Sequence, residues 1–236
     1  KDTAADSGSW QVEDFDDYRS GQAGTLRVPL WYSSVASDEH QWVVTNIPEA
    51  KRAFWSATLA VSRSFQDNWS LNASYTRAHR YGNTYKSNGY DTLFENPNNL
   101  VNSNGLLPGF NDDEVKLHGL YEFPWKMRVS GTFTYLSGEH YTPYVRTGRI
   151  NGTRYYINVE PRGSRTYPSE SLLDLRLTQI VPVTKKINAE AFVEVFNAFN
   201  VGTALTWNER ADSEYYRLPY TVESGRRLRL GFRVNF

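Results

Sequence analysis

The sequence lacks cysteine, a surplus of charge and any long apolar run. Without cysteine the chain cannot form a disulfide scaffold, a thiol active site or a zinc site with cysteine ligands. Its 26 basic residues are balanced by 26 acidic ones, which argues against a nucleic acid partner because phosphate binding needs a basic surplus on one face. No apolar run approaches the roughly 20 residues of a membrane-spanning helix.

Aromatic residues, by contrast, are plentiful. Phe, Trp and Tyr make up 15% of the 236 residues, although the mean hydropathy is −0.60. A transmembrane β-barrel reconciles the two values, because only alternate residues of each strand face lipid while aromatic side chains collect at both interfaces. On composition alone, a soluble β-sandwich or lectin remains an alternative.

Alternation of apolar and polar residues predicts seven strands of about ten to thirteen residues. In the first, Trp55, Leu59 and Val61 share one face, while Ser56 and Thr58 share the other. Strands of this length suit an oblique crossing of a membrane, whereas globular strands average about five or six residues. Within the seven predicted strands, the alternating stretches are residues 55–65, 69–76, 115–123, 127–135, 173–178, 187–195 and 228–236.

The connections between these strands are alternately short and long. Outer-membrane barrels have short periplasmic turns and long extracellular loops, so the same pattern is expected here. An Asn-Gly pair at 151–152 predicts a small hairpin within the second long loop. The short connections are 66–68, 124–125 and 182–185, and the long ones are 82–112, 138–169 and 199–224.

The predicted fold class is therefore all-β: a segment of an antiparallel transmembrane β-barrel with about seven to eight long strands. Residues 51–236 are expected to be the C-terminal strands of the barrel. Residues 1–50 are expected to hold the end of a preceding strand and an extracellular loop. The expected location is the bacterial outer membrane, with its lipid as a partner.

The last predicted strand alternates to the end of the sequence and finishes on an aromatic residue. Such a strand resembles the C-terminal targeting strand of outer-membrane barrels, which the barrel assembly machinery reads. Its outward positions are Leu228, Leu230, Phe232, Val234 and Phe236.

Several segments, in order and spacing, resemble TonB-dependent outer-membrane receptors of the Oar-like type, whose full chains carry an N-terminal carboxypeptidase-regulatory-like domain. The penultimate strand resembles that family's "vFNlfN" motif, and other strands resemble its "G-x-Y-x-x-P-W", "lDLRl" and "aSYt" segments. The resemblance covers about residues 50–236. The matching segments are EVFNAFN at 194–200, GLYEFPW at 119–125, VSG at 129–131, YLSG at 135–138, LDLRL at 173–177 and NASYT at 72–76.

The resemblance implies an approximately 22-stranded barrel around an N-terminal plug, energised by TonB from the inner membrane. Seven strands are too few for such a barrel, so a missing N-terminal barrel and plug portion, or a companion barrel chain, is an expected partner. The implied role is to form barrel wall and extracellular loops that bind substrate or a partner. The alternatives are a small self-contained outer-membrane barrel acting as an adhesin or structural protein, and a soluble carbohydrate-binding β-sandwich.

No catalytic signature stands out. The four histidines are isolated in sequence, and neither an HExxH nor a GxSxG motif is present. We therefore expect no enzyme activity, no cofactor and no resident metal. Two acidic segments, residues 13–17 and 111–114, carry oxygen ligands of the kind that calcium prefers, but their spacing does not match an EF-hand and solvated loops are expected.

Two sets of aromatic residues have separate expected roles. Aromatics near the strand ends are expected at the membrane interfaces: Trp55, Trp69, Tyr121, Trp125 and Tyr135. Aromatics in the long loops could bind a substrate or a surface lipoprotein, because Tyr and Trp give rigid contact area with a polar handle; equally, they could pack on one another. The loop candidates are Tyr85, Tyr90, Tyr144, Tyr155, Trp207 and Tyr216.

Overall fold

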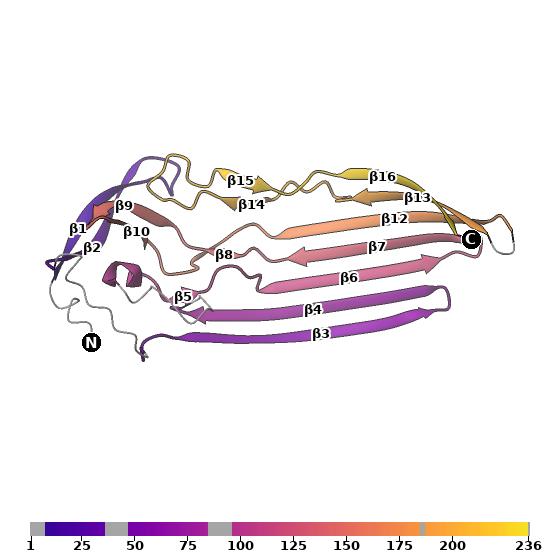
Figure 1. Cartoon of the computed structure of the whole chain (residues 1–236), viewed down its shortest axis with the longest axis horizontal. Helices are drawn as coiled ribbons and strands as arrows, with labels where there is room; N and C mark the ends of the chain where they lie inside the picture. Colours follow the sequence, from indigo (N-terminus) through magenta and orange to yellow (C-terminus); the bar gives the residue numbers. More distant parts are fainter. Residues whose placement is uncertain (1–7, 36–46, 85–95, 185–186, 236) are drawn as a thin grey trace.

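Long antiparallel strands form one sheet, and shorter two-stranded sheets lie at one of its ends (Figure 1). The computed structural model describes residues 8–35, 47–84, 96–184 and 187–235. In this part of the chain, no helix has the length and hydropathy needed to cross a membrane.

The long sheet has the order β16-β13-β12-β7-β6-β4-β3, and the short strand β5 pairs with the end of β4. Every neighbouring pair is antiparallel. The predicted all-β fold class, with about seven long antiparallel strands in one sheet, is confirmed. The strands are β3 (Arg52–Gln66), β4 (Trp69–Gly82), β5 (Gly105–Leu106), β6 (Asp113–Glu122), β7 (Met127–Leu136), β12 (Glu170–Pro182), β13 (Asn188–Phe196) and β16 (Arg227–Asn235).

The register aligns the apolar faces of neighbouring strands. Leu59 lies opposite Tyr75, Tyr75 opposite Val115, and Val115 opposite Tyr135. Because the side-chain period of a strand is two, a slip of one residue at any ladder would move a whole strand's apolar set to the other face. The seven alternating patterns therefore join into one apolar face and one polar face.

Tight turns join the long strands at the end of the sheet opposite the loops. Asp67 and Asn68 connect β3 to β4 with φ values of 54° and 71°. Two successive positive φ values are typical of the two-residue hairpin turn, and Asp and Asn tolerate that conformation better than most residues. The described end of β16 lies at this same end of the sheet (Figure 1).

The long connections fold into further structure at the other end. The predicted hairpin is present: Asn151 and Gly152, both with positive φ, join β9 to β10. We call the assembly formed by residues 8–33, 97–112, 137–169 and 197–226 the loop layer. Its elements are β1 (Gly8–Asp17), β2 (Gly24–Ser33), the 3-10 helix η2 (Pro97–Leu100), β8 (His140–Tyr141), β9 (Tyr144–Ile150), β10 (Thr153–Asn158), β11 (Arg165–Thr166), β14 (Ala204–Trp207) and β15 (Pro219–Val222).

The buried hydrophobic core lies in the loop layer and not against the long sheet. Leu30 of β2 and Val145 and Ile157 of the β9–β10 hairpin are each 0% exposed. On the long sheet, by contrast, Leu59 is 69% and Leu230 is 70% exposed. The loop layer thus stabilises itself by burial, while the sheet presents a broad apolar surface outward.

Residues 8–33 form the β1–β2 hairpin, which packs into this core. Its ladder pairs every residue from Gly8 to Asp17 with a partner on β2. The sequence prediction for residues 1–50, a preceding strand followed by an outer loop, stays a prediction.

Candidate functional site

The polar face of the long sheet carries charges that are paired across strands. Glu194 accepts from Nη1 of Arg176 at 2.9 Å on one side and from Nε of Arg229 on the other. Near the tight turns, Glu122 lies 3.1 Å from Nζ of Lys126 and 2.6 Å from Nε of Arg128. Such cross-strand pairs are typical of a polar barrel interior, and they leave both carboxylates engaged.

The predicted interface aromatics lie at two levels of the outward face. Trp55 lies near the loop end of β3, and Tyr135 near the loop end of β7. Trp69 and Tyr121, which are cross-strand partners, lie at the turn end together with Trp125 of the β6–β7 turn. Their role at a membrane interface stays a prediction.

The outward face of β16 carries the described residues of the predicted targeting strand: Leu228, Leu230, Phe232 and Val234. All four are exposed, while Phe236 lies outside the described residues. The targeting role stays a prediction.

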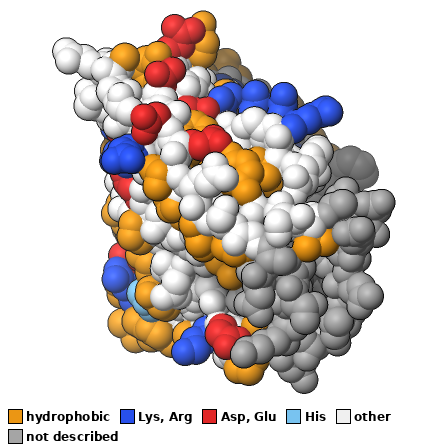
Figure 2. Space-filling view, turned by 90° about the vertical axis from the view of Figure 1, so that its left-hand side faces the viewer, with side chains coloured by type: hydrophobic (Ala, Val, Ile, Leu, Met, Phe, Trp, Pro, Cys, Tyr) orange, Lys and Arg blue, Asp and Glu red, His pale blue; other side chains and the backbone are white. Residues whose placement is uncertain are grey.

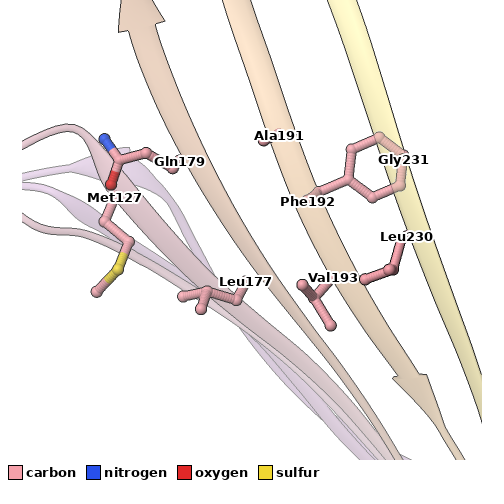
Figure 3. A pocket seen from close by; sticks show the side chains of 8 residues that line it. All are labelled: Met127, Leu177, Gln179, Ala191, Phe192, Val193, Leu230 and Gly231. Atoms are coloured by element: carbon pink, nitrogen blue, oxygen red, sulfur yellow. The ribbon is translucent and has the colours of Figure 1, made fainter.

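A shallow apolar hollow of about 350 Å³ lies between β12, β13 and β16 on the outward face. Met127, Leu177, Val193 and Leu230 line it, with Ala191 leaving space between larger neighbours (Figure 3). Gln179 contributes the one polar side chain among the lining residues, and the rest of the lining is apolar, so the hollow suits a flexible hydrocarbon better than a polar ligand.

Trp207 is the centre of an aromatic cluster in the loop layer. Its ring centroid lies 4.8 Å from that of Tyr167 and 5.4 Å from that of Tyr141, and the indole is almost completely buried. The Tyr216 hydroxyl lies 3.4 Å from the Tyr141 hydroxyl. Trp207 and Tyr216 therefore pack with other loop aromatics, which was one of the two arrangements expected for them.

This cluster also holds a half-buried carboxyl group, that of Glu209. The Tyr167 hydroxyl donates to Oε1 of Glu209. Burial raises the pKa of Glu209, and burial followed by the hydrogen bond to Glu209 raises the pKa of Tyr167. Nε1 of Trp207 has no hydrogen-bond partner among the described residues. The cluster thus packs aromatic rings from three segments of the loop layer around the buried Trp207 indole.

The other loop candidates are divided between the two faces of the β9–β10 hairpin. Tyr155 packs against the hydrophobic core, and its hydroxyl accepts from Nδ2 of Asn96 at 2.9 Å. Tyr144 meets Tyr156 edge-to-face on the opposite face, with ring centroids 5.5 Å apart. Tyr85 and Tyr90 lie outside the described residues. A binding role for the six loop candidates stays a prediction.

Three exposed arginines, which the sequence analysis did not single out, share the face of Tyr144 and Tyr156: Arg146, Arg149 and Arg154. Arg149 and Arg154 are direct cross-strand partners, placed symmetrically about the Asn151–Gly152 turn. That symmetry is a sequence signal that could have identified the pair. Figure 2, which views the loop end, shows basic side chains gathered beside hydrophobic and acidic ones.

Charged side chains tie the β1–β2 hairpin to the rest of the loop layer. Nη1 of Arg19 lies 2.7 Å from Oε1 of Glu160. Nη2 of Arg165 lies 2.7 Å from the same oxygen. Arg19 in turn pairs with Asp17 at 2.8 Å. Hydrogen bonds from Arg165, partly offset by burial, hold the pKa of Glu160 down at about 2.

The acidic segments have protein partners in the loop layer. Glu13 accepts from the Tyr32 hydroxyl, and Oδ2 of Asp112 lies 3.0 Å from Nε2 of His140. Within the described ranges, no group of three or more His, Asp or Glu side chains could hold a metal ion. These carboxylates contribute to the folding of the loops through the contacts named.

Comparison with known proteins gives one structural similarity. No family model matches the chain, and no curated protein matches it. The chain is similar to the ferripyoverdine receptor of the outer membrane of Pseudomonas aeruginosa, solved bound to ferripyoverdine, with 14% sequence identity and a TM-score of 0.45. The similarity covers 78% of this chain and 19% of that receptor, so the chain spans a small part of the receptor's length.

Proposed function

We propose that this chain forms part of the wall and the extracellular loops of a TonB-dependent outer-membrane receptor or transporter. The observation that carries the proposal is the two-faced sheet. Its outward face is apolar and exposed, and its other face carries cross-strand ion pairs such as those of Glu194. A wall between lipid and a polar lumen needs both features.

The spacing of the aromatic residues supports the same placement. Eleven residue steps separate Trp55 from Gln66, the cross-strand partner of Trp69. At about 3.3 Å per residue and the strand tilt of about 40° usual in outer-membrane barrels, these steps span roughly 28 Å. This value is close to the height of the apolar band in such barrels, which is about 25 Å and has a girdle of aromatic residues at each edge. In a membrane, acyl chains would fill the hollow shown in Figure 3.

The unpaired edges of the sheet support a larger barrel. Among the described residues, β3 and β16 each have a single neighbour, and the sheet does not close on itself. An open edge cannot face hydrocarbon, because no water is there to satisfy its N–H and C=O groups. We therefore propose that strands from a longer polypeptide, or from a companion chain, complete the wall together with a plug.

A soluble β-sandwich fits the sheet less well. A sandwich would bury its apolar face between two sheets, whereas residues such as Leu59 and Phe232, each 69% exposed, have no covering layer among the described residues. The proposal extends to the complete assembly. We propose that this assembly takes up its substrate actively, couples to TonB, is inserted by the barrel assembly machinery and binds a surface lipoprotein.

Cysteine accessibility tests the membrane placement directly, because these 236 residues contain no cysteine of their own. Leu230→Cys on β16 and Thr132→Cys on β7 lie on opposite faces of the wall. In outer-membrane vesicles, a membrane-impermeant maleimide should label Thr132→Cys and leave Leu230→Cys unlabelled until detergent is added. Equal labelling of both positions without detergent would contradict the proposal.

The mass of the native polypeptide separates the receptor from a small barrel. Denaturing gels and mass spectrometry of the native outer membrane should detect this sequence in a species far above 27.1 kDa, or at that mass together with a companion barrel chain. A species at 27.1 kDa without a companion would favour the adhesin or structural barrel.

A further inference from the structure

The exposed face of the β9–β10 hairpin has a composition that its own contacts do not explain. Arg146, Arg149 and Arg154 are all exposed on it. None of the three has a side-chain hydrogen bond or ion pair within the described part of the chain. Elsewhere in the loop layer, Arg19 and Arg165 each pair with a carboxylate.

A β-bulge places the three arginines on one face. Arg146 pairs with Tyr156, and Arg149 pairs with Arg154. Two residues of β9 lie between these pairs but only one residue of β10, so β9 contains one extra residue. Without the extra residue, strict alternation would turn Arg149 away from the face of Arg146. The buried Thr147 supports the bulge, because its Oγ1 accepts from the backbone N–H of Tyr155 at 3.0 Å and donates to the carbonyl of Gly148.

The cost of this arrangement points to a ligand. Arg149 lies directly opposite Arg154, and like charges in that position destabilise a ladder. An anion between them would remove the repulsion, and the planar guanidinium fork binds carboxylate and phosphate groups with two parallel hydrogen bonds. The hairpin beneath is rigid, because Val145, Ile150 and Ile157 on its other face are buried in the hydrophobic core.

Two tyrosines complete the surface. Tyr156, which is 59% exposed, lies opposite Arg146 and meets Tyr144 edge-to-face. An exposed aromatic face packs well against the C–H groups of a sugar ring, and tyrosine adds a hydroxyl for hydrogen bonding. Unpaired arginines beside such tyrosines match a chain that carries both negative charges and sugar rings.

We propose that the exposed face of the β9–β10 hairpin binds an acidic oligosaccharide, with Arg149 and Arg154 holding its carboxylate or phosphate groups and Tyr156 packing against a ring. The inference rests on the proposed function only in placing the hairpin on the cell exterior. Binding to purified protein in detergent does not depend on that placement, so its failure and the failure of the cysteine-labelling experiment are distinguishable.

The experiment measures the binding of oligogalacturonate by the native protein purified from the outer membrane in detergent, with a neutral dextran oligomer and oligoglutamate as comparison probes. Wild type should bind oligogalacturonate and not dextran. The double variant Arg149→Gln/Arg154→Gln should bind at least about tenfold more weakly, since each guanidinium supplies charge-assisted hydrogen bonds. The matched control Arg226→Gln, which removes an exposed arginine elsewhere in the loop layer, should stay within about twofold of wild type.

Two further variants test the chemistry. Arg149→Lys/Arg154→Lys keeps the charge but loses the fork, so it should bind more weakly than wild type and more tightly than the glutamine variant. Tyr156→Ala should weaken binding of oligogalacturonate without weakening that of oligoglutamate. Equal affinities of wild type and the glutamine variant would overturn the proposal, and so would the absence of oligogalacturonate binding. Tighter binding of oligoglutamate than of oligogalacturonate would replace the saccharide by an acidic peptide.

Discussion

Nη1 of Arg19 lies 2.7 Å from Oε1 of Glu160, a residue 141 positions later in the chain. This ion pair joins the turn of the β1–β2 hairpin to the segment that follows β10. Because Arg165 binds the same carboxylate, Glu160 links the N-terminal hairpin to the second long loop, and the loop layer behaves as one folded unit.

Replacing Glu160 with Gln should loosen the β1–β2 hairpin. The folded state holds the pKa of Glu160 at about 2, below its usual value of 4.5, so the stabilisation is present above about pH 4.5 and is lost as the pH falls toward 2. The shift corresponds to about 3 kcal/mol at neutral pH. Hydrogen exchange at pH 7 should be faster in residues 24–33 of Glu160→Gln than in wild type.

The matched control for this variant is Asp16→Asn, which removes a negative charge from the same hairpin at an exposed position. Its exchange at residues 24–33 should equal that of wild type. Equal exchange in Glu160→Gln and wild type at pH 7 would show that the apolar core alone holds the hairpin in place.

A charge on the outward face of the sheet should cost far more than one on the polar face. Leu230→Arg, near mid-strand on β16, is expected to cost about 2–4 kcal/mol in lipid vesicles if it lies near the membrane midplane. Thr132→Arg should cost much less, because its neighbours are polar: His118 lies 3.0 Å from the Thr132 hydroxyl, and Asp174 is its cross-strand partner. Urea unfolding from vesicles measures both, and equal costs would contradict the assignment of the two faces.

The wall of long strands could be predicted from the sequence because its signal is local. A period of two along each strand, as at Leu59 and Val61, reports which face each residue occupies, and short polar turns separate the hairpins. The Asn151–Gly152 turn is equally local, since its residues are those that accept positive φ.

The loop layer could not be predicted in the same way, because its contacts join residues far apart in the chain. Nothing near Trp207 in the sequence indicates that Tyr141 and Tyr167 will bury it. Likewise, Arg146, Arg149 and Arg154 share one face only because a β-bulge lies in β9 between Thr147 and Ile150. The bulge shifts the alternation, so that residues after it point to the opposite face from the one that their position would predict. Simple alternation therefore assigns the wrong face to Arg149, and the sequence analysis did not single it out.

Asn98 should be among the most sensitive positions of the loop layer. Its buried side chain accepts from the backbone N–H of Trp31 at 2.6 Å and donates to the Trp31 carbonyl at 2.9 Å, completing the outer edge of β2. Asn98→Ala leaves both backbone groups without this partner and should cost about 1–3 kcal/mol. Protection of residues 24–33 from hydrogen exchange measures the loss.

Asn98→Asp tests the donor half of this contact separately. A carboxylate can still accept from the Trp31 N–H but cannot donate to the Trp31 carbonyl, so this variant should also lose protection at neutral pH. Lowering the pH should restore part of it, because a protonated carboxyl can donate. Wild-type protection in both variants would contradict the role given to Asn98.

Gly231 and Phe192 should be energetically coupled. They are cross-strand partners, and the Phe192 ring extends toward Gly231 (Figure 3). A Cβ at Gly231 would lie 2.1 Å from Cζ of Phe192, so the ring must move. The guanidinium of Arg176, 4.0 Å from the ring centroid, opposes that movement. Gly231→Ala is therefore expected to cost about 1–3 kcal/mol.

The double-mutant cycle isolates this clash from the general effect of adding a side chain to a strand. In a Phe192→Ala background the space above Gly231 is free, and a strand interior favours alanine over glycine because glycine loses more backbone freedom on folding. Gly231→Ala should then be neutral or stabilising, with a coupling of about 0.5–3 kcal/mol between the two sites. Urea unfolding of the four proteins measures the cycle. Strictly additive costs would mean that the ring does not depend on the missing Cβ, and that a different constraint requires glycine at this position.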